Sequence, residues 1–281
     1  MNFAGKIVNF DTPKVMGVLN VTPDSFSDGG ELILDSGKLS IDKAMQRAEA
    51  MHQAGASFID IGGESTRPGA EEINLEEEME RVLPLVEKIN NNIDIIISID
   101  TSSPEIMLEG AKAGAGLIND VRALQKSGAV EAVSNINLPV CLMHMKGAPA
   151  TMQEAPKYKN LINEILQFLE KRISVCTNSG IDRNKIIIDP GFGFGKALEH
   201  NLELLGRLSE FKKLKLPILV GLSRKAMLGL ITGRSVKERQ AAGISAAMIA
   251  LMQGVNIIRT HDVTETVDAV NVCLAVKISE L

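Results

Sequence analysis

Cysteine is scarce in this sequence, which has only three among 281 residues: Cys141, Cys176 and Cys273. The number is odd and no two of them form a C-x-x-C pair, so a disulfide framework is not expected. Free cysteine usually behaves as a small buried hydrophobe. We therefore expect three reduced, structural cysteines, as in a cytoplasmic protein.

Basic residues are not in excess, and no long hydrophobic run is present. Lys and Arg total 30 against 35 Asp and Glu, giving a net charge of −5, whereas nucleic-acid-binding surfaces need clustered basic side chains. No segment approaches the roughly 18 apolar residues of a membrane span, and residues 1–10 contain no apolar core of a secretory signal. We expect no nucleic-acid partner, no membrane partner and a cytoplasmic location.

A short apolar run that ends in polar residues, by contrast, recurs eight times along the chain. The runs cover residues 15–19, 58–61, 95–99, 117–118, 140–143, 186–188, 218–222 and 257–258. Apolar runs without strict alternation are typical of parallel strands buried on both faces. Polar residues at the C-terminal ends of eight such strands indicate the active-site face of a (β/α)₈ barrel.

Helical periodicity fills the intervals between the runs. Helices are predicted over 41–55, 74–83, 104–114, 129–135, 159–180, 201–211, 236–253 and 263–278. Several begin at a cap or a proline and several end at glycine. This uninterrupted β-α order predicts one parallel sheet closed on itself. We predict an α/β fold, a TIM barrel forming a single domain over residues 1–281, with a doubly wound sheet as the alternative.

The polar residues at the strand ends form two chemical sets. The first is Asp100, Asn119, Asp189 and Lys225; the second is Asn20, Thr66, Arg67, Arg259 and His261. The first set suits a flat heterocycle with an amidine-like edge and a carbonyl. The second suits phosphate oxygens, and its Asn could add an oxygen ligand to Mg²⁺. The spacing therefore suggests a phosphorylated, nitrogen-rich small molecule.

Plainer interpretations remain open for these residues. Asp189 precedes a Pro-Gly pair, and its whole role could be to start a turn. The role of Asp100 could simply be to cap the helix that begins near residue 104. Arg259 and His261 could pair with surface carboxylates, and Phe26 could be loop packing. The coincidence of so many candidates at strand ends on one face favours a site.

The run Asp189-Pro-Gly-Phe-Gly-Phe-Gly-Lys196 looks like a nucleotide-binding loop but does not match one. A P-loop needs G-x-x-x-x-G-K-[ST], and here the first glycine is one residue too close and Ala197 replaces the hydroxyl residue. The dinucleotide fingerprint is missing as well. We expect these glycines to let the backbone approach a flat ligand. His144, between two methionines, is at least as readily a packed core histidine as a site residue.

Several motifs make the chain resemble the dihydropteroate synthase family of pterin-binding TIM barrels. The longest are MGVLNVTPDSFSDGG at residues 16–30 and DIGGESTRPG at residues 60–69; the others lie at 118–121, 142–145, 189–196, 223–225 and 259–262. The resemblance implies a transferase that condenses 6-hydroxymethyl-7,8-dihydropterin diphosphate with p-aminobenzoate in folate biosynthesis. The products would be 7,8-dihydropteroate and pyrophosphate, formed by an SN1-like displacement.

The resemblance also implies roles for the residues that match the family motifs. The pterin would be held by Asp100, Asn119, Asp189 and Lys225, with Arg259 along the ring and Met143, Phe194, Gly221 and Ser223 also in the substrate site. The diphosphate would be held by Asn20, Thr66, Arg67 and His261, with Asn20 on a Mg²⁺ cofactor. Phe26, Asp28 and Pro68 would close over p-aminobenzoate, for which sulfonamides would compete. Asp100, Asp189, Lys225, Arg259, Phe26 and Asp28 would be the catalytic residues.

The family pattern leaves some points open. Ala226 stands where the family often has Ser, and residues 31–39 are slightly long. A corrinoid methyltransferase domain would keep the pterin acids but lack the two long loop motifs, and an inactive paralogue would have lost one of the diphosphate or pterin residues. Neither pattern is seen. A homodimer is expected, with the apolar helix around residues 246–252 as a candidate surface unless that helix packs on the barrel.

Overall fold

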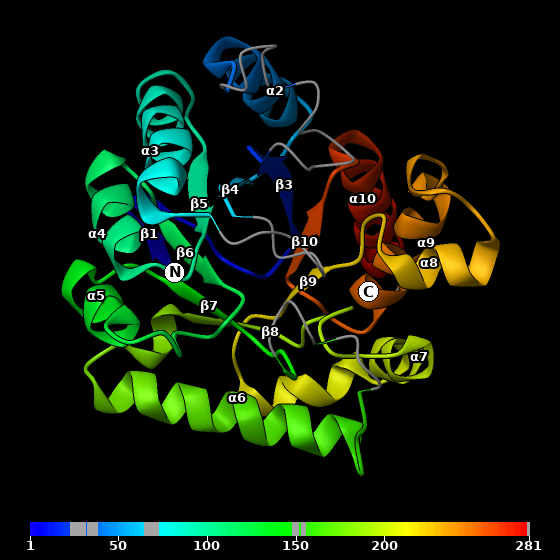
Figure 1. Cartoon of the computed structure of the whole chain (residues 1–281). Helices are drawn as coiled ribbons and strands as arrows, with labels where there is room; N and C mark the ends of the chain where they lie inside the picture. Colours follow the sequence, from blue (N-terminus) through cyan, green and yellow to red (C-terminus); the bar gives the residue numbers. More distant parts are fainter. Residues whose placement is uncertain (23–31, 33–38, 65–72, 148–151, 153–155, 280–281) are drawn as a thin grey trace.

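The computed structural model describes residues 1–22, 32, 39–64, 73–147, 152 and 156–279. Eight parallel strands form a barrel with helices around it (Figure 1). The strands are β3 (Lys14–Asn20), β4 (Phe58–Gly62), β5 (Ile96–Asp100), β6 (Leu117–Asp120), β7 (Val140–Met143), β8 (Ile186–Asp189), β9 (Leu219–Gly221) and β10 (Ile257–Thr260). Each apolar run of the sequence forms one strand, and the predicted (β/α)₈ barrel is confirmed.

The barrel closes at two places that a doubly wound sheet would leave open. The first and last barrel strands, β3 and β10, pair in parallel. Between β8 and β9 the contact is smaller: Ile188 bridges Ile218, and the Ile188 N–H donates to the Pro217 carbonyl at 3.0 Å. An open sheet has two unpaired edges, so the doubly wound alternative is wrong.

The outer layer consists of helices that follow the strands. They are α2 (Ile41–Gln53), α3 (Leu75–Asn92), α4 (Pro104–Ala113), α5 (Ala129–Ile136), α6 (Leu161–Asn178), α7 (Leu198–Gly206), α8 (Ala226–Thr232), α9 (Gln240–Met252) and α10 (Val263–Ser279), with 3₁₀ turns η1 (Arg183–Lys185), η2 (Leu208–Leu214) and η3 (Val236–Glu238). Ser40, Asn74 and Asn160 cap α2, α3 and α6 through their side chains. Within the described ranges, none of these helices is long and apolar enough to cross a membrane.

Two predicted helices are divided in the structure. The helix predicted over 201–211 is interrupted between α7, which ends at Gly206, and η2, which begins at Leu208. The helix predicted over 236–253 is interrupted as well. The turn η3 ends at Glu238, and α9 begins only at Gln240. The Arg239 side chain between them turns back and donates to the carbonyls of Arg234, at 3.0 Å, and Arg224, at 3.2 Å. These tertiary hydrogen bonds hold the break, which helical periodicity alone does not reveal.

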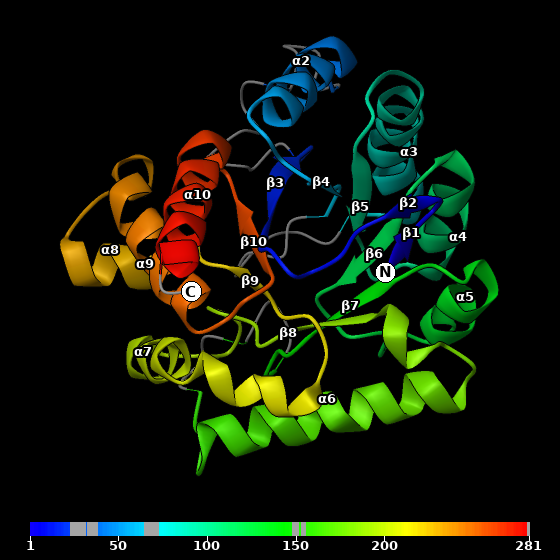
Figure 2. The same cartoon turned by 180° about the vertical axis from the view of Figure 1, so that it is seen from behind.

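An N-terminal hairpin, which the sequence did not predict, covers the barrel end opposite the strand C-termini. It consists of β1 (Asn2–Phe3) and β2 (Lys6–Ile7) and lies over β5 and β6 in the rear view (Figure 2), where the chain that follows it runs across the barrel end to β3. The Phe3 ring meets the Phe58 ring edge-on at 5.1 Å. Phe3 joins an apolar cluster made by the inward side chains of the strand starts. The hairpin therefore covers this end of the barrel.

Inward positions change from apolar to polar along the strands. β3 presents Met16 and Val18 before Asn20, and β5 presents Ile96 and Ser98 before Asp100, since side chains alternate across a strand. The positions between them, such as Ile97 and Ile99, pack against the helices. This gradient gives the barrel a dry floor and a polar mouth.

Candidate active site

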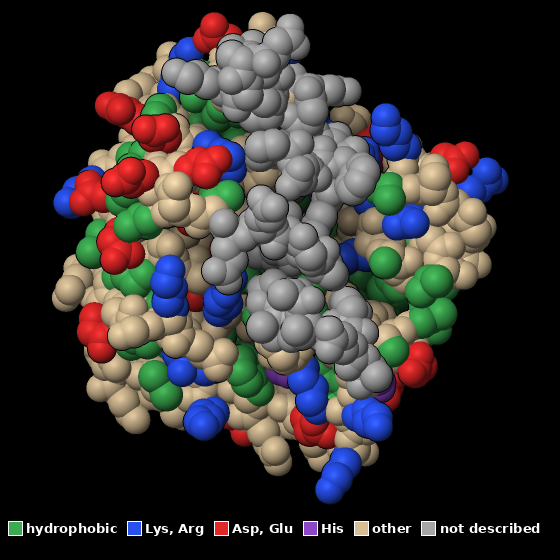
Figure 3. Space-filling model, viewed as in Figure 1, with side chains coloured by type: hydrophobic (Ala, Val, Ile, Leu, Met, Phe, Trp, Pro, Cys, Tyr) green, Lys and Arg blue, Asp and Glu red, His purple; other side chains and the backbone are tan. Residues whose placement is uncertain are grey.

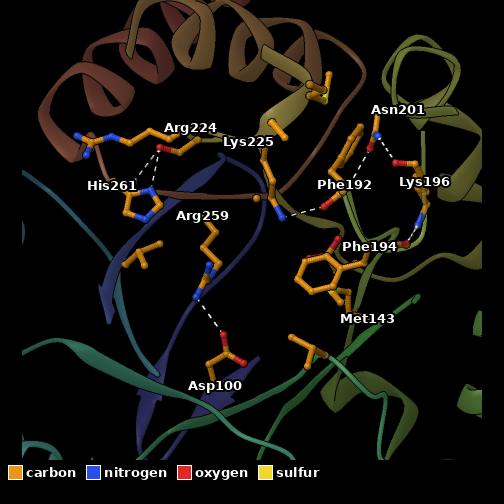
Figure 4. Close-up of a pocket in the computed structure, with 18 of the residues that line it drawn as sticks. Asp100, Met143, Phe192, Phe194, Lys196, Asn201, Arg224, Lys225, Arg259 and His261 are labelled. Atoms are coloured by element: carbon orange, nitrogen blue, oxygen red, sulfur yellow. Dashed lines mark hydrogen bonds and ion pairs between the residues drawn. The ribbon is translucent and has the colours of Figure 1, made fainter. Parts of the chain in front are cut away.

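A pocket of about 530 Å³ opens at the C-terminal ends of the strands, a size typical of small-molecule sites. The structure brings eleven predicted site residues into its lining: Asn20, Asp100, Asn119, Met143, Asp189, Phe194, Gly221, Ser223, Lys225, Arg259 and His261. The other predicted site residues, Phe26, Asp28, Thr66, Arg67 and Pro68, lie outside the described residues. Figure 4 shows Asp100, Arg259, Lys225 and Phe194 around one space, while the Arg224 side chain points away from it.

Arg259 occupies the base of the pocket and bridges two carboxylates. Its Nε lies 2.6 Å from Asp60 Oδ2, and its Nη2 lies 3.1 Å from Asp100 Oδ2 (Figure 4 draws the second contact). Burial, with the nearby Asp60 charge, raises the pKa of Asp100 to about 7. Arg259 therefore pairs with carboxylates inside the barrel rather than with surface ones. Asp100 does not cap α4, whose N-cap is Ser103.

Lys225 enters the pocket from the turn between β9 and α8. Its Nζ donates to the Phe192 carbonyl at 2.8 Å and lies 4.4 Å from the centre of the Phe194 ring. Burial lowers the pKa of Lys225 to about 8, since a low-dielectric site disfavours the ammonium. The Lys225 amine is therefore held in a fixed position, and it loses its proton more readily than the amine of an exposed lysine.

The turn that carries Lys225 is fixed by an acidic residue at the end of β10. Arg224 adopts a left-handed conformation, with φ of 58°, and its Nη2 lies 2.7 Å from Asp262 Oδ1. Asp262 Oδ2 also accepts from Ser223 Oγ at 3.2 Å, while Ser223 Oγ lies 3.1 Å from His261 Nδ1. The Arg224–Asp262 pair therefore joins the Ser223 turn to the strand that carries Arg259. The sequence did not predict this pair.

The glycine-rich run after β8 forms one wall of the pocket around a buried lysine. Lys196 Nζ donates to the Gly191 carbonyl at 2.7 Å and the Phe194 carbonyl at 3.2 Å, and lies 3.0 Å from His144 Nδ1. A Cβ at Gly191, where φ is +75°, would overlap the His144 carbonyl oxygen. The glycines do allow a close backbone approach. At Gly191, however, the backbone approaches the His144 backbone of the same chain rather than a ligand.

Two open questions of this region are answered by the same contacts. His144 is buried, and its pKa falls to about 2 because of burial and the Lys196 charge, so it is a neutral core histidine. Asp189 Oδ1 accepts the Gly191 N–H at 2.7 Å; it starts a turn and lines the pocket at once. Burial raises the pKa of Asp189. Lys196 had no recognisable sequence signal beyond the glycines before it.

A second polar cluster anchors the chain where it leaves β4. Glu64 receives two hydrogen bonds from the Arg122 guanidinium, at 3.0 and 3.1 Å, and Arg122 also donates to Ser102 Oγ at 2.9 Å. Such bidentate pairs fix geometry as well as charge. Glu64 lies directly before residues 65–72, which include Thr66 and Arg67. Sequence reasoning did not identify this pair, because its members are 58 residues apart.

The donors available for a divalent cation are few. Asn20 ends β3 beside Gly62, whose missing side chain leaves room next to the Asn20 amide oxygen. Among the described residues, no group of three His, Cys, Asp or Glu could hold a metal. One amide oxygen fits a Mg²⁺ that keeps several waters and binds substrate phosphate oxygens. It does not fit a cation held by the protein alone.

The fold and the pocket together define an enzyme of small-molecule chemistry on a TIM barrel. Carboxylates, amides and cations line one pocket at the C-terminal mouth. Similarity to known proteins supports this class of enzyme. The profile of the family "Pterin binding enzyme" matches residues 16–261. A dihydropteroate synthase of Escherichia coli K12 is 51% identical over 268 residues, which cover 95% of this chain and 93% of that protein.

Solved structures give the same relationship. A Yersinia pestis dihydropteroate synthase with a sulfonamide drug superposes with a TM-score of 0.95, at 48% identity and 99% coverage of both chains. A Xanthomonas albilineans dihydropteroate synthase with 4-aminobenzoic acid gives a TM-score of 0.90, at 43% identity, covering 98% of this chain and 97% of that one. The chain therefore belongs to the pterin-binding enzymes, in the dihydropteroate synthase family, and it is a transferase of folate biosynthesis.

Proposed function

We propose that the chain joins its dihydropterin and p-aminobenzoate substrates in this pocket, with the pterin ring against β5, β6, β8 and β10. The observation that carries the proposal is the convergence of Asp100, Asn119, Asp189, Lys225 and Arg259 on one space. Carboxylates accept from the amino and ring N–H groups of a pterin, and an ammonium donates to its carbonyl. Arg259 lies along the ring, where its planar guanidinium can stack.

The diphosphate is proposed to lie toward His261 and Asn20. Both line the same pocket as the pterin residues. Thr66 and Arg67, outside the described residues, complete the proposed diphosphate set. Mg²⁺, when bound by Asn20 and substrate oxygens, would supply charge stabilisation for the departing diphosphate. A Lys or Arg donor next to phosphate oxygens provides charge-assisted hydrogen bonds for the same purpose.

The p-aminobenzoate ring is proposed to bind above the pterin, toward α8. Met227 and Leu230 of α8 line that side of the pocket, and hydrophobic side chains gather at this edge of the molecule (Figure 3), where Leu230 is 69% exposed. Phe26, Asp28 and Pro68 belong to the proposed closing loops, which lie outside the described residues. Sulfonamides, which share the aniline group, would compete at the same place.

The proposed reaction is a dissociative, SN1-like displacement. The bond between the pterin methylene carbon and the diphosphate oxygen breaks first, and its electron pair leaves with the diphosphate. The positive charge that remains on carbon is delocalised into the pterin ring. Asp100 and Asp189 stabilise that charge by their fixed positions, the kind of electrostatic effect that usually dominates catalysis. The aniline nitrogen then donates its lone pair to form the C–N bond and releases a proton to solvent.

Pyrophosphate release tests this proposal. Purified protein is given the pterin diphosphate and Mg²⁺, with and without p-aminobenzoate. Release that requires p-aminobenzoate, together with dihydropteroate formation, supports the proposal. Asp100→Asn should lower turnover about 100-fold or more without unfolding the protein, whereas Asp42→Asn, a surface carboxylate paired with Lys88, should not. Pterin binding without turnover would favour the inactive-paralogue or methyltransferase reading, and normal turnover in Asp100→Asn would contradict the assigned role.

A homodimer and a cytoplasmic location complete the proposal. Helix α9 packs on the barrel through Ala246, Ala250 and Leu251, while Ile249 and Met252 of the same helix are 46% and 76% exposed. Exposed apolar side chains of this kind suit a self-complementary interface. The three cysteines are free and buried, as expected in a reducing compartment. Light scattering should give twice the 30.3 kDa chain mass; a mass of one chain at micromolar concentration would contradict the dimer.

A further inference from the structure

Asp60 is a buried carboxylate for which the proposed reaction has no direct use. It lies on β4 between the inward residues Phe58 and Gly62, and its side chain is 0% exposed. It lies one inward position below the pocket mouth and is absent from the pocket lining. Aspartate is almost never fully buried unless it is paired. Its contacts therefore need an explanation.

One oxygen of Asp60 serves two residues of the pocket above it. Oδ2 accepts a hydrogen bond from Arg259 Nε at 2.6 Å and another from Asn119 Nδ2 at 3.1 Å. Oδ1 has no hydrogen-bond partner in the described part of the chain, and neither has Oγ of Ser98, the register neighbour of Asp60 on β5. Unsatisfied buried polar atoms reduce stability. A costly group of this kind in a barrel core is more readily explained by function than by folding.

The contact with Asp60 determines which atom of the Asn119 amide, the oxygen or the nitrogen, is directed toward the ligand. Because Nδ2 donates downward to Asp60, the amide oxygen is the atom free to accept from a ligand N–H. A neutral amide at residue 60 could donate as well as accept, and the Asn119 amide could then turn over. Asp60 thus specifies an acceptor at this point of the pocket.

The contact with Arg259 fixes the guanidinium. With Nε held by Asp60, the planar group directs Nη2 to Asp100 at 3.1 Å. Two anchors at two separate nitrogens leave the plane little freedom to rotate, and pre-organisation of this kind is what a binding site needs from a support. Removing Asp60 would leave Arg259 with one anchor.

Asp60 also contributes to the charge around Asp100. The charged groups that act on Asp100 come from several elements: Asp60 and Glu64 from β4 and its end, Arg259 from β10, Asp120 from β6, and Lys225 before α8. Asp60 opposes ionisation of Asp100, and Arg259 favours it. Without Asp60, Asp100 would ionise at lower pH.

We propose that Asp60 is a positioning residue of the pterin pocket, which holds the Arg259 guanidinium and the Asn119 amide in their ligand-binding orientations without touching the substrate. The inference rests on the pterin-binding role proposed above. It adds a residue from beneath the pocket to the set that determines pterin recognition.

The test is Asp60→Asn, which keeps the side-chain volume, compared with Ser98→Ala as a matched change in the same layer of the barrel. Binding of 6-hydroxymethylpterin is measured by calorimetry from about pH 5.5 to about pH 8.5, alongside thermal unfolding. Asp60→Asn should weaken binding at neutral pH roughly 10- to 100-fold, the effect of a lost charge-assisted hydrogen bond. It should also move the acid midpoint of binding to lower pH. Ser98→Ala should stay within about twofold of wild type.

A merely structural role for Asp60 would weaken binding at all pH values alike and leave the midpoint unchanged, and that result would overturn the inference. Wild-type affinity in Asp60→Asn would overturn it too. If Asp60→Asn does not fold, the double variant with Arg259→Met removes both members of the buried Asp60–Arg259 pair. Because Asn119 also depends on Asp60, this double variant should bind the pterin more weakly than Arg259→Met alone, and equal affinity of the two contradicts the inference. A wild-type protein that binds no pterin overturns the proposed function itself.

Discussion

Gly191 offers a direct test of how the pocket wall is built. It lies in the run after β8 with φ of +75°, and a Cβ there would overlap the His144 carbonyl oxygen, with the carbonyl carbon at 3.0 Å. The Gly191→Ala substitution therefore imposes both a left-handed conformation on alanine and a collision between two backbones. Gly233, at the C-terminal end of α8, provides the matched control, because its φ is +70° but no atom lies within 4 Å of its Cβ position.

The two substitutions share one cost and differ in the other. The left-handed conformation costs an L-residue roughly 1–2 kcal/mol. Overpacking adds typically 1–3 kcal/mol, and only Gly191→Ala incurs it. We expect Gly233→Ala to lower the free energy of unfolding by about 1–2 kcal/mol and Gly191→Ala by about 2–5 kcal/mol. For a domain of this size the difference corresponds to a gap in Tm of roughly 2–12 °C.

Catalytic activity should distinguish Gly191→Ala from Gly233→Ala further. The His144 strand end cannot move without moving the wall that carries Phe192 and Phe194, and a displacement of about 1 Å in a site can cost on the order of 100-fold in rate. Urea and thermal unfolding, followed by kcat/KM for the pterin diphosphate, measure both effects. Equal stability and equal activity of Gly191→Ala and Gly233→Ala would refute the reasoning, because the backbone collision would then have no consequence.

Three further predictions concern the charges of the site. The pKa of Asp100, raised to about 7, predicts that pterin diphosphate kcat/KM falls as pH is lowered through about 7. The folded protein then holds a proton that the unfolded chain loses near pH 4, so the contribution of Asp100 to stability falls as pH rises from about 4 to about 7. A flat activity profile contradicts this prediction. A pH dependence of unfolding in Asp100→Asn as steep as that of the wild type contradicts it too. Lys196→Met removes the ammonium from the Gly191 and Phe194 carbonyls and from His144 Nδ1, although the Gly191 carbonyl still accepts the Phe194 N–H at 3.3 Å. The substitution should lower the free energy of unfolding by about 2–4 kcal/mol and weaken pterin binding in calorimetry. Unchanged stability would mean that the wall does not depend on this lysine. A double-mutant cycle with Glu64→Gln and Arg122→Met should give a coupling of about 1–2 kcal/mol in urea unfolding, and additive effects would show that the two hydrogen bonds do not stabilise the fold.

The eight strands and the face that carries chemistry could be predicted because both depend on local patterns. A strand buried on both faces needs an apolar run, and the polar residue that ends it, such as Asp100 or Asp189, meets its counterparts wherever parallel strands close into a barrel. The helix start at Asn74 was readable for a similar reason, since a cap acts only on its own first turn.

Contacts between distant residues were not readable. The N-terminal hairpin covers the barrel floor through Phe3 and Phe58, and Arg239 divides a predicted helix by reaching the Arg224 carbonyl. Neither contact produces a periodic pattern in the sequence. Each of these residues, taken alone, is compatible with several structural roles. Both depend on which surfaces the closed barrel brings together.

The sequence alone determined the barrel, its catalytic face and the chemical types gathered there, because strand burial and strand-end polarity are properties of short segments. Only the tertiary structure decided how those groups are supported. Asp60 and Arg259 are 199 residues apart, and Lys196 and His144 are 52 apart. Such pairs form when the strands close, and whether a buried charge has a partner can be seen only in the folded chain.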